Sequence, residues 1–132
     1  MVSIDSMQLL RAAEEAATRA HAPYSKFKVG AAALAPDGTI LAGCNVENVS
    51  YGLTNCAERT AIFTGIAGGY RSFQAMAIVC QAEAAVSPCG ACRQVLAEFC
   101  GPDTPIYIAA AGRLGDYETF RLGDLLPKAF EL

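Results

Sequence analysis

Three cysteines and one glutamate, in two short segments, have the residue types and spacing of a metal site. Cys56 is followed two residues later by Glu58, and Cys89 and Cys92 form a Cys-x-x-Cys pair in the segment 87–92. Thiolates are typical zinc ligands, and a zinc ion held by three protein ligands keeps a fourth position for water or substrate. The sequence therefore predicts zinc held by Cys56, Cys89 and Cys92, although a Cys-x-x-Cys pair alone also fits two core-facing cysteines.

Glu58 has two interpretations. It lies three residues after Asn55, so it fits a capping box, in which a glutamate hydrogen-bonds back to the start of its helix. Its place on the same helical turn as Cys56 instead favours a proton shuttle for a water at the metal, and we prefer this hypothesis.

Three thiolates on a dication leave a net negative charge. Arg59 is therefore expected to hydrogen-bond the sulfurs, the alternative being an arginine that extends into solvent.

Hydrophobic periodicity and turn residues indicate the elements that must position this site. Pro36-Asp37-Gly38 predicts the turn of an antiparallel hairpin, and Pro23 should follow the end of the first helix. Asn55 and Ser87 are expected to be N-caps, with Pro88 at the first helical position. The predicted helices span residues 5–20, 55–68, 88–99 and 123–130, and the predicted strands span 29–35, 39–46, 75–80, 106–110 and 117–122. This order predicts a single α/β domain over residues 1–132, with a mixed sheet covered by helices on both faces.

Composition excludes several classes of function. The chain has 132 residues, 53% of them hydrophobic, and a formal net charge of −3 without a run of Lys or Arg. Binding to nucleic acid or to an anionic membrane surface is therefore not expected. The sequence has neither an apolar stretch of membrane-spanning length nor a basic N-terminal segment followed by an apolar core. We expect a cytoplasmic protein whose six cysteines are reduced thiols, some of them metal ligands.

Several motifs resemble those of one enzyme family. Cys-Ala-Glu-Arg at 56–59 and Pro-Cys-Gly-Ala-Cys-Arg-Gln at 88–94 resemble the motifs of the zinc-dependent deaminase superfamily. Tyr24-Ser25-Lys26-Phe27, Asn45-Val46-Glu47-Asn48 and a cysteine as first ligand further resemble the small three-cysteine cytidine deaminases, and the likeness extends to residues 126–130. The resemblance implies a three-layer α/β/α sandwich around a five-stranded mixed sheet. It also implies one Zn²⁺ per subunit and a homotetramer with shared active sites.

The resemblance implies roles for further residues in binding the substrate. Phe27 should pack on the pyrimidine, and Asn45 and Glu47 should hydrogen-bond the ribose hydroxyls. The backbone at Ala57 should help to bind the base. Without the resemblance, Phe27 also fits a plain core aromatic.

Two more residues are implied at subunit contacts. Phe130 should close the site of a neighbouring subunit, although it also fits a core aromatic, and Tyr51 should lie near a subunit contact. His21 is the only histidine. It matches no ligand position, and we expect it to have no catalytic role.

The implied function is hydrolytic deamination of cytidine and 2′-deoxycytidine to uridine and 2′-deoxyuridine, with release of ammonia, in pyrimidine salvage. Because the sequence has no Gly-rich phosphate loop and no basic patch, a free nucleoside is favoured over a nucleotide or a polynucleotide. One alternative is a related aminohydrolase acting on another cytosine nucleoside, such as blasticidin S. Another is a non-enzymatic zinc module, which would need a fourth protein ligand that the sequence does not place beside these three cysteines.

Overall fold

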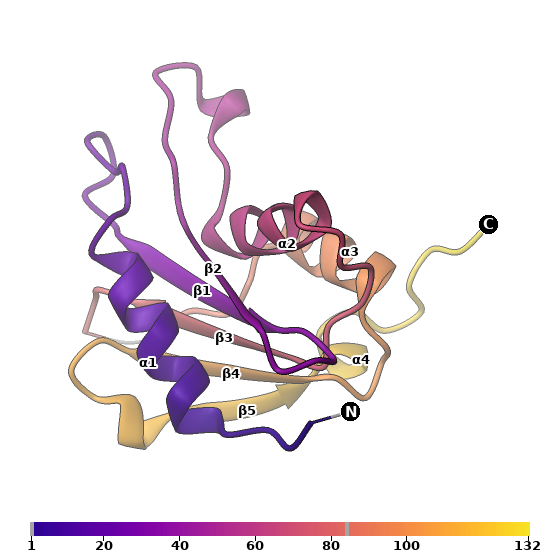
Figure 1. Cartoon of the computed structure of the whole chain (residues 1–132). Helices are drawn as coiled ribbons and strands as arrows, with labels where there is room; N and C mark the ends of the chain where they lie inside the picture. Colours follow the sequence, from indigo (N-terminus) through magenta and orange to yellow (C-terminus); the bar gives the residue numbers. More distant parts are fainter. Residues whose placement is uncertain (1, 84) are drawn as a thin grey trace.

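The computed structural model describes residues 2–83 and 85–132, and its centre is a five-stranded sheet with the strand order β2-β1-β3-β4-β5 (Figure 1). The strands are β1 (Val29–Leu34), β2 (Ile40–Cys44), β3 (Ala75–Cys80), β4 (Pro105–Ala110) and β5 (Glu118–Arg121). The helices are α1 (Ser6–Ala17), α2 (Ala57–Ala67), α3 (Gly90–Phe99) and α4 (Leu122–Leu125). Strands β3 and β4 run parallel, whereas the β1–β2, β1–β3 and β4–β5 pairs are antiparallel. The predicted mixed sheet is confirmed.

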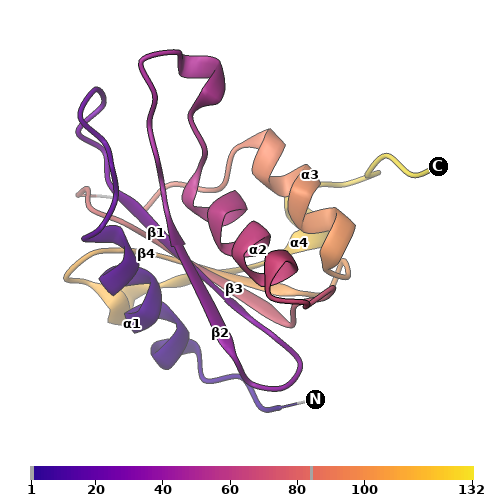
Figure 2. The same ribbon diagram turned by 45° about the horizontal axis from the view of Figure 1, so that its top comes forward.

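Helices cover both faces of this sheet. Helix α1 packs on one face, and α2 and α3 lie together on the other (Figure 2). Successive residues of a strand point to opposite faces. Ala77 and Val79 of β3 accordingly belong to the core beneath α1, whereas Met76 and Ile78 belong to the core beneath α2 and α3. The predicted three-layer α/β/α arrangement is confirmed.

Two glycines allow the helices to lie very close to the strands. A Cβ atom on Gly30 of β1 would overlap the backbone of Ala13 and Ala17 in α1. A Cβ atom on Gly43 of β2 would overlap the backbone of Ala61 in α2. The position of each helix is therefore set by contact with the strand backbone, and α2 carries part of the predicted site.

Helix α2 begins at Ala57, and its N-cap is one residue later than predicted. Its N-cap is Cys56, and the side chain of Asn55 donates a hydrogen bond to the hydroxyl of Thr60 at 3.1 Å. The backbone of Asn55 pairs with Val46 in an antiparallel bridge, with N–H to O distances of 2.9 Å in both directions. This pairing keeps Asn55 extended, so the predicted N-cap was wrong. The sulfur of Cys56 consequently lies at the helix start itself.

Helix α3 also begins later than predicted. It starts at Gly90 with Cys89 as N-cap, so the prediction of Ser87 as cap and Pro88 as first helical residue was wrong. The hydroxyl of Ser87 and the carbonyl of Pro88 instead accept hydrogen bonds from the side chain of Arg93. Arg93, a residue of α3, thus holds Ser87 and Pro88 outside the helix.

Two helices are shorter than predicted. Helix α1 ends at Ala17, and the following turn to residue 20 continues with i→i+3 bonds. Helix α4 ends at Leu125 because Leu126, the residue before Pro127, has φ −137° and ψ 72°. Lys128 then has a positive φ of 53°, which breaks the helix predicted to residue 130. Among the described residues, no helix has the length and apolar character needed to cross a bilayer.

Candidate active site

The three predicted metal ligands converge at the N-terminal ends of α2 and α3. Cys56 and Cys89 are the N-cap residues, and Cys92 lies in the first turn of α3. The three sulfurs lie within 4.8 Å of one another, with 3.9 Å between Cys56 and Cys89 and 3.3 Å between Cys89 and Cys92. Sulfurs bound to one tetrahedral zinc at ~2.3 Å are ~3.8 Å apart. The cluster therefore fits a single zinc ion.

Positive groups surround these sulfurs. The N-terminal ends of two helices point their partial positive charge at the cluster. Arg59 donates a hydrogen bond from Nη2 to Cys56 Sγ at 3.3 Å, as predicted for this arginine. The hydrogen bond with Cys92, and then Arg59, lower the pKa of Cys56 to about 5. The same contact with Cys56, together with burial, raises the pKa of Cys92.

Glu58 is a buried carboxyl beside this cluster. Its residue is only 5% exposed, in the first turn of α2. Burial raises the pKa of Glu58, and the negative charge of Cys56 raises it further. Because the N-cap is Cys56, Glu58 is the second helical residue, and the capping-box alternative was wrong. A carboxyl in this environment is suited to accept a proton and to release it again.

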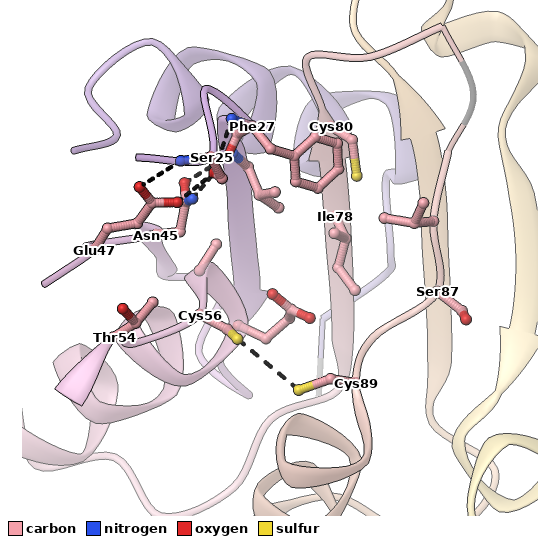
Figure 3. A pocket seen from close by; sticks show the side chains of 14 residues that line it. Ser25, Phe27, Asn45, Glu47, Thr54, Cys56, Ile78, Cys80, Ser87 and Cys89 are labelled. Atoms are coloured by element: carbon pink, nitrogen blue, oxygen red, sulfur yellow. Dashed lines mark hydrogen bonds between the residues drawn. The ribbon is translucent and has the colours of Figure 1, made fainter. Parts of the chain in front are cut away.

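The predicted residues line one cleft. Its walls include Phe27, Asn45, Glu47, Cys56, Ala57, Glu58 and Cys89, while Cys92 is buried. Figure 3 shows the ring of Phe27 beside Cys80, with Ile78 below it and the sulfurs of Cys56 and Cys89 at the other end of the cleft. The cleft thus joins an aromatic ring at one end to the metal ligands and a carboxyl at the other.

Asn45 holds the strand and loop that carry Phe27. Its Oδ1 accepts a hydrogen bond from the N–H of Val29 at 2.9 Å, and its Nδ2 donates to the carbonyl of Phe27 at 2.8 Å. The side-chain amide of Asn45 has two hydrogens, and the second one is not used in these two bonds. Its predicted contact with a ribose stays a prediction, while its bonds to the loop are observed.

Glu47 fixes the other end of the same loop (Figure 3). Its Oε1 accepts from two backbone N–H groups, at 2.9 Å from Tyr24 and 3.1 Å from Ser25. The hydroxyl of Ser25 donates to the second carboxylate oxygen and accepts from the N–H of Phe27 at 3.0 Å. The hydroxyl of Ser25 is the main group that lowers the pKa of Glu47. Glu47 is therefore a carboxylate near neutral pH, at the rim of the cleft.

Comparison with known proteins agrees with this geometry. Residues 4–108 match the family model described as the zinc-binding region of cytidine and deoxycytidylate deaminases. The chain belongs to this deaminase family. A cytidine deaminase of Sporosarcina psychrophila is 52% identical over 127 residues, which cover 96% of this chain and 92% of that relative.

Solved deaminase structures share the fold as well. The crystal structure of cytidine deaminase from Burkholderia pseudomallei aligns with a TM-score of 0.90 and 48% identity, covering 96% of this chain and all of that chain (100%). A blasticidin-S deaminase of Bacillus cereus is more distant, at 28% identity over 121 residues, 86% of this chain and 85% of that protein. Together with the three converging sulfurs, the family match identifies this deaminase as a zinc-dependent hydrolase.

Two predicted site residues of the deaminase lie outside the cleft of their own chain. Phe130 is 73% exposed on the C-terminal segment, which extends away from the sheet (Figure 1). Tyr51 is 77% exposed in a short 3₁₀ turn, and its ring packs edge to face against Tyr24 with centroids 6.4 Å apart. Their roles at subunit contacts stay predictions.

Sequence reasoning missed several residues that shape the cleft. Val29, Ile78, Cys80 and Val86 add apolar wall. Ile78 and Cys80 were predicted only as part of a buried strand, but their alternate positions at the end of that strand were a signal that they share one face. Ser25 was recognised within a motif without a role. Its position two residues before Phe27 is what allows its hydroxyl to bond that backbone.

Proposed function

We propose that the protein hydrolyses cytidine and 2′-deoxycytidine to uridine and 2′-deoxyuridine and releases ammonia. The observation that supports this most strongly is that Glu58 and two zinc-ligand cysteines line the same cleft as Phe27. This arrangement provides a carboxyl for proton transfer beside a metal site, with an aromatic surface for a flat heterocycle. Membership of the deaminase family supports the same conclusion.

Glu58 is the residue that moves protons in this proposal. When bound by the three cysteines, zinc supplies Lewis acidity that makes water a stronger acid. Glu58 takes a proton from the water that attacks C4 of the pyrimidine and transfers it to ring N3. Glu58 then takes the remaining proton from the hydroxyl group now on C4 and delivers it to the amino group, which leaves as ammonia while C4 becomes a carbonyl carbon. Burial raises the pKa of Glu58 and thereby assists its return to the protonated state.

In this proposal, the loop that Asn45 and Glu47 hold in place binds the substrate. The ring of Phe27 packs on the pyrimidine, and the unused amide hydrogen of Asn45 and the carboxylate of Glu47 bind the ribose hydroxyls. Ala57, the first residue of α2, offers a backbone N–H without an acceptor in its own helix, which suits the carbonyl oxygen of the base. All four residues line the cleft.

The negative charge of Glu47 favours a nucleoside without a 5′-phosphate. A substrate panel tests this choice by comparing kcat/KM for cytidine, 2′-deoxycytidine, cytidine 5′-monophosphate and cytosine. We expect turnover of both nucleosides and at least ~10-fold lower kcat/KM for the monophosphate, because bringing its phosphate beside a carboxylate costs more than ~1.4 kcal/mol. Equal values for cytidine and its monophosphate would contradict the proposal.

Blasticidin S is the second candidate substrate, since a blasticidin-S deaminase is a distant relative. The same panel includes it, and a higher kcat/KM for blasticidin S than for cytidine would reverse the assignment. Stoichiometric zinc without turnover of any cytosine compound would instead favour a structural zinc module. Within the described part of the chain, the metal-ligating group contains three residues, one fewer than such a module needs.

We further propose a cytoplasmic homotetramer that serves pyrimidine salvage. Val49, Tyr51 and Leu53 expose large apolar side chains on one projecting loop, and Phe130 is exposed on the C-terminal segment. Such surfaces favour association between copies of the chain. Light scattering coupled to size-exclusion chromatography should give four times the 13.8 kDa chain mass. A monomer with full activity would contradict shared active sites.

A further inference from the structure

Arg93 connects the segment before Cys89 to the end of α4. Its Nε donates a hydrogen bond to the carbonyl of Pro88 at 2.7 Å, and its Nη2 donates to the hydroxyl of Ser87 at 3.1 Å. Its Nη1 donates to the carbonyl of Leu125 at 2.6 Å. Arg93 does not line the cleft in the described structure, and the proposed proton transfers do not use it.

The segment held by Arg93 contains the buried Pro88 but lacks regular secondary structure. Residues 85–89 form neither helix nor strand, and the N-cap Cys89 makes no side-chain capping bond. Cys89 is exposed, and among the three cysteines of the cluster it is the most exposed. Pro88 precedes Cys89 directly, so a hydrogen bond to the Pro88 carbonyl restrains the peptide that leads into the ligand.

Helix α4, the other segment that Arg93 contacts, also depends on a contact from outside the helix. Helix α4 has only four residues, too short to be stable by its own hydrogen bonds. Its last carbonyl groups have no N–H donor within the helix, and a cation at a helix C-terminus is favourable. A planar guanidinium reaches several acceptors at once in fixed directions, which an ammonium group does not. Arg93 thus ties two weakly structured segments to the first turn of α3.

We propose that Arg93 is a positioning residue for the zinc ligand Cys89 and strengthens zinc binding by holding the segment 87–89 against α4. The inference rests on the zinc site of the proposed function and deepens it. Arg59 contacts a sulfur directly, whereas Arg93 acts through the Pro88 peptide. Its loss therefore weakens zinc binding by displacing a ligand, and breaks no hydrogen bond to a sulfur.

The test compares zinc affinity in Arg93→Ala with a matched control, Arg71→Ala. Arg71 also donates to two carbonyl groups, those of Ile66 at 3.0 Å and Tyr70 at 2.7 Å, at the other end of α2. Competition with a chromophoric zinc chelator measures the zinc Kd of each purified holoenzyme. We expect a ~10- to 100-fold higher Kd for Arg93→Ala, the range found when a residue that orients a metal ligand is removed. Arg71→Ala should stay within about twofold of the wild type.

Two further variants keep the test decisive. Arg93→Lys retains the charge without the planar fork, so it should still raise the zinc Kd several-fold. Ser87→Ala removes a single one of the three hydrogen bonds and should have the smallest effect of the set. A wild-type Kd in Arg93→Ala would overturn the proposal, and if that variant does not fold, a wild-type Kd in Arg93→Lys would overturn it.

The chosen readout separates this inference from the proposed function. Zinc affinity is measured without substrate, so it does not depend on which nucleoside the enzyme accepts. At saturating zinc, kcat per bound zinc should return to within a few-fold of the wild type in Arg93→Ala. A lower melting temperature with unchanged zinc Kd would show a merely structural role and contradict the proposal.

Discussion

The two faces of the sheet are built from different kinds of residue. Beneath α1 the buried cluster contains Leu, Ala and Val side chains, among them Leu9, Leu10 and Ala13. On the other face an apolar cluster is buried as well, but α2 and α3 there also carry a buried carboxyl, Glu58, and the buried thiol of Cys92. Apolar burial stabilises the fold, whereas burial of an ionisable group opposes it unless the group is paired. Both faces therefore supply stability through apolar burial, and the α2–α3 face uses part of that stability to hold reactive groups.

The largest expected effect is the loss of a metal ligand on the α2–α3 face. Cys89→Ala should reduce zinc content far below one ion per chain and abolish measurable turnover of cytidine, because two thiolates do not complete a zinc site. Elemental analysis and an ultraviolet assay of cytidine loss check both results. Cys44→Ala, which changes a cysteine of β2 outside the cluster, should keep zinc and activity. Tight stoichiometric zinc in Cys89→Ala would contradict the ligand assignment.

A change on the α1 face should lower the stability of the protein and leave its catalytic rate nearly unchanged. Gly30→Ala places a methyl group into the backbone of α1, so the free energy of unfolding should fall by ~3 kcal/mol. Urea denaturation measures this loss. The kcat per zinc-loaded, folded molecule should stay within about twofold of the wild type, since α1 contributes no residue to the cleft among those described. Gly115→Ala is the control, because its Cβ would meet no atom within 4 Å.

An intermediate effect is expected at the substrate end of the cleft. Phe27→Ala should lower kcat/KM for cytidine by about 10- to 100-fold, since stacking of a base on an aromatic ring contributes ~1–3 kcal/mol. The zinc content should be unchanged because Phe27 lies away from the sulfurs. Phe27→Leu should fall between the wild type and Phe27→Ala. An unchanged kcat/KM in Phe27→Ala would remove this residue from the binding site.

The smallest expected effect lies outside both faces, in the β1–β2 turn. The carboxylate of Asp37 accepts from the N–H of Thr39 at 3.0 Å and from the hydroxyl of Tyr70 at 2.9 Å. These bonds, led by that from the Thr39 backbone, lower the pKa of Asp37. A lowered folded-state pKa adds stability above the unfolded pKa, and this stability is lost as the pH falls through the folded pKa.

Asp37→Asn should therefore destabilise the protein slightly at pH ~7, and the difference from the wild type should shrink as the pH falls below ~4. Urea denaturation at a series of pH values measures this difference. Turnover of cytidine at neutral pH should not change. A destabilisation that grows as the pH falls would contradict the sign of the pKa shift.

The sequence predicted the residues of the site better than the local structure around them. Cys56, Glu58 and Cys89 could be found because their residue types and spacing indicate metal chemistry directly. The helix starts at Asn55 and Ser87 were predicted wrongly, although both are good capping residues. Asn55 pairs with Val46 and Ser87 bonds Arg93, and such contacts between separate segments are not encoded in local propensity.

Other features could not be predicted because they depend on contacts between segments that are far apart in the sequence. The contact of Arg93 with the carbonyl of Leu125 joins residues 32 positions apart, and the apolar wall of Ile78 and Val86 forms only when β3 meets the loop before α3. The five strands were predictable because short apolar runs bounded by turn residues are typical of strands. Which helices cover which face of the sheet was not predictable from these runs, since it depends on how distant segments pack.

Glu58→Gln tests most directly whether the buried carboxyl is kept for chemistry rather than for stability. The variant should bind one zinc per chain and melt at or above the wild-type temperature, because an amide is less costly to bury than a carboxylate. Its turnover of cytidine should fall by ~10³-fold or more, since proton transfer loses its carrier. Zinc-loaded Glu58→Gln with turnover within about tenfold of the wild type would contradict the assignment of Glu58 as the proton shuttle.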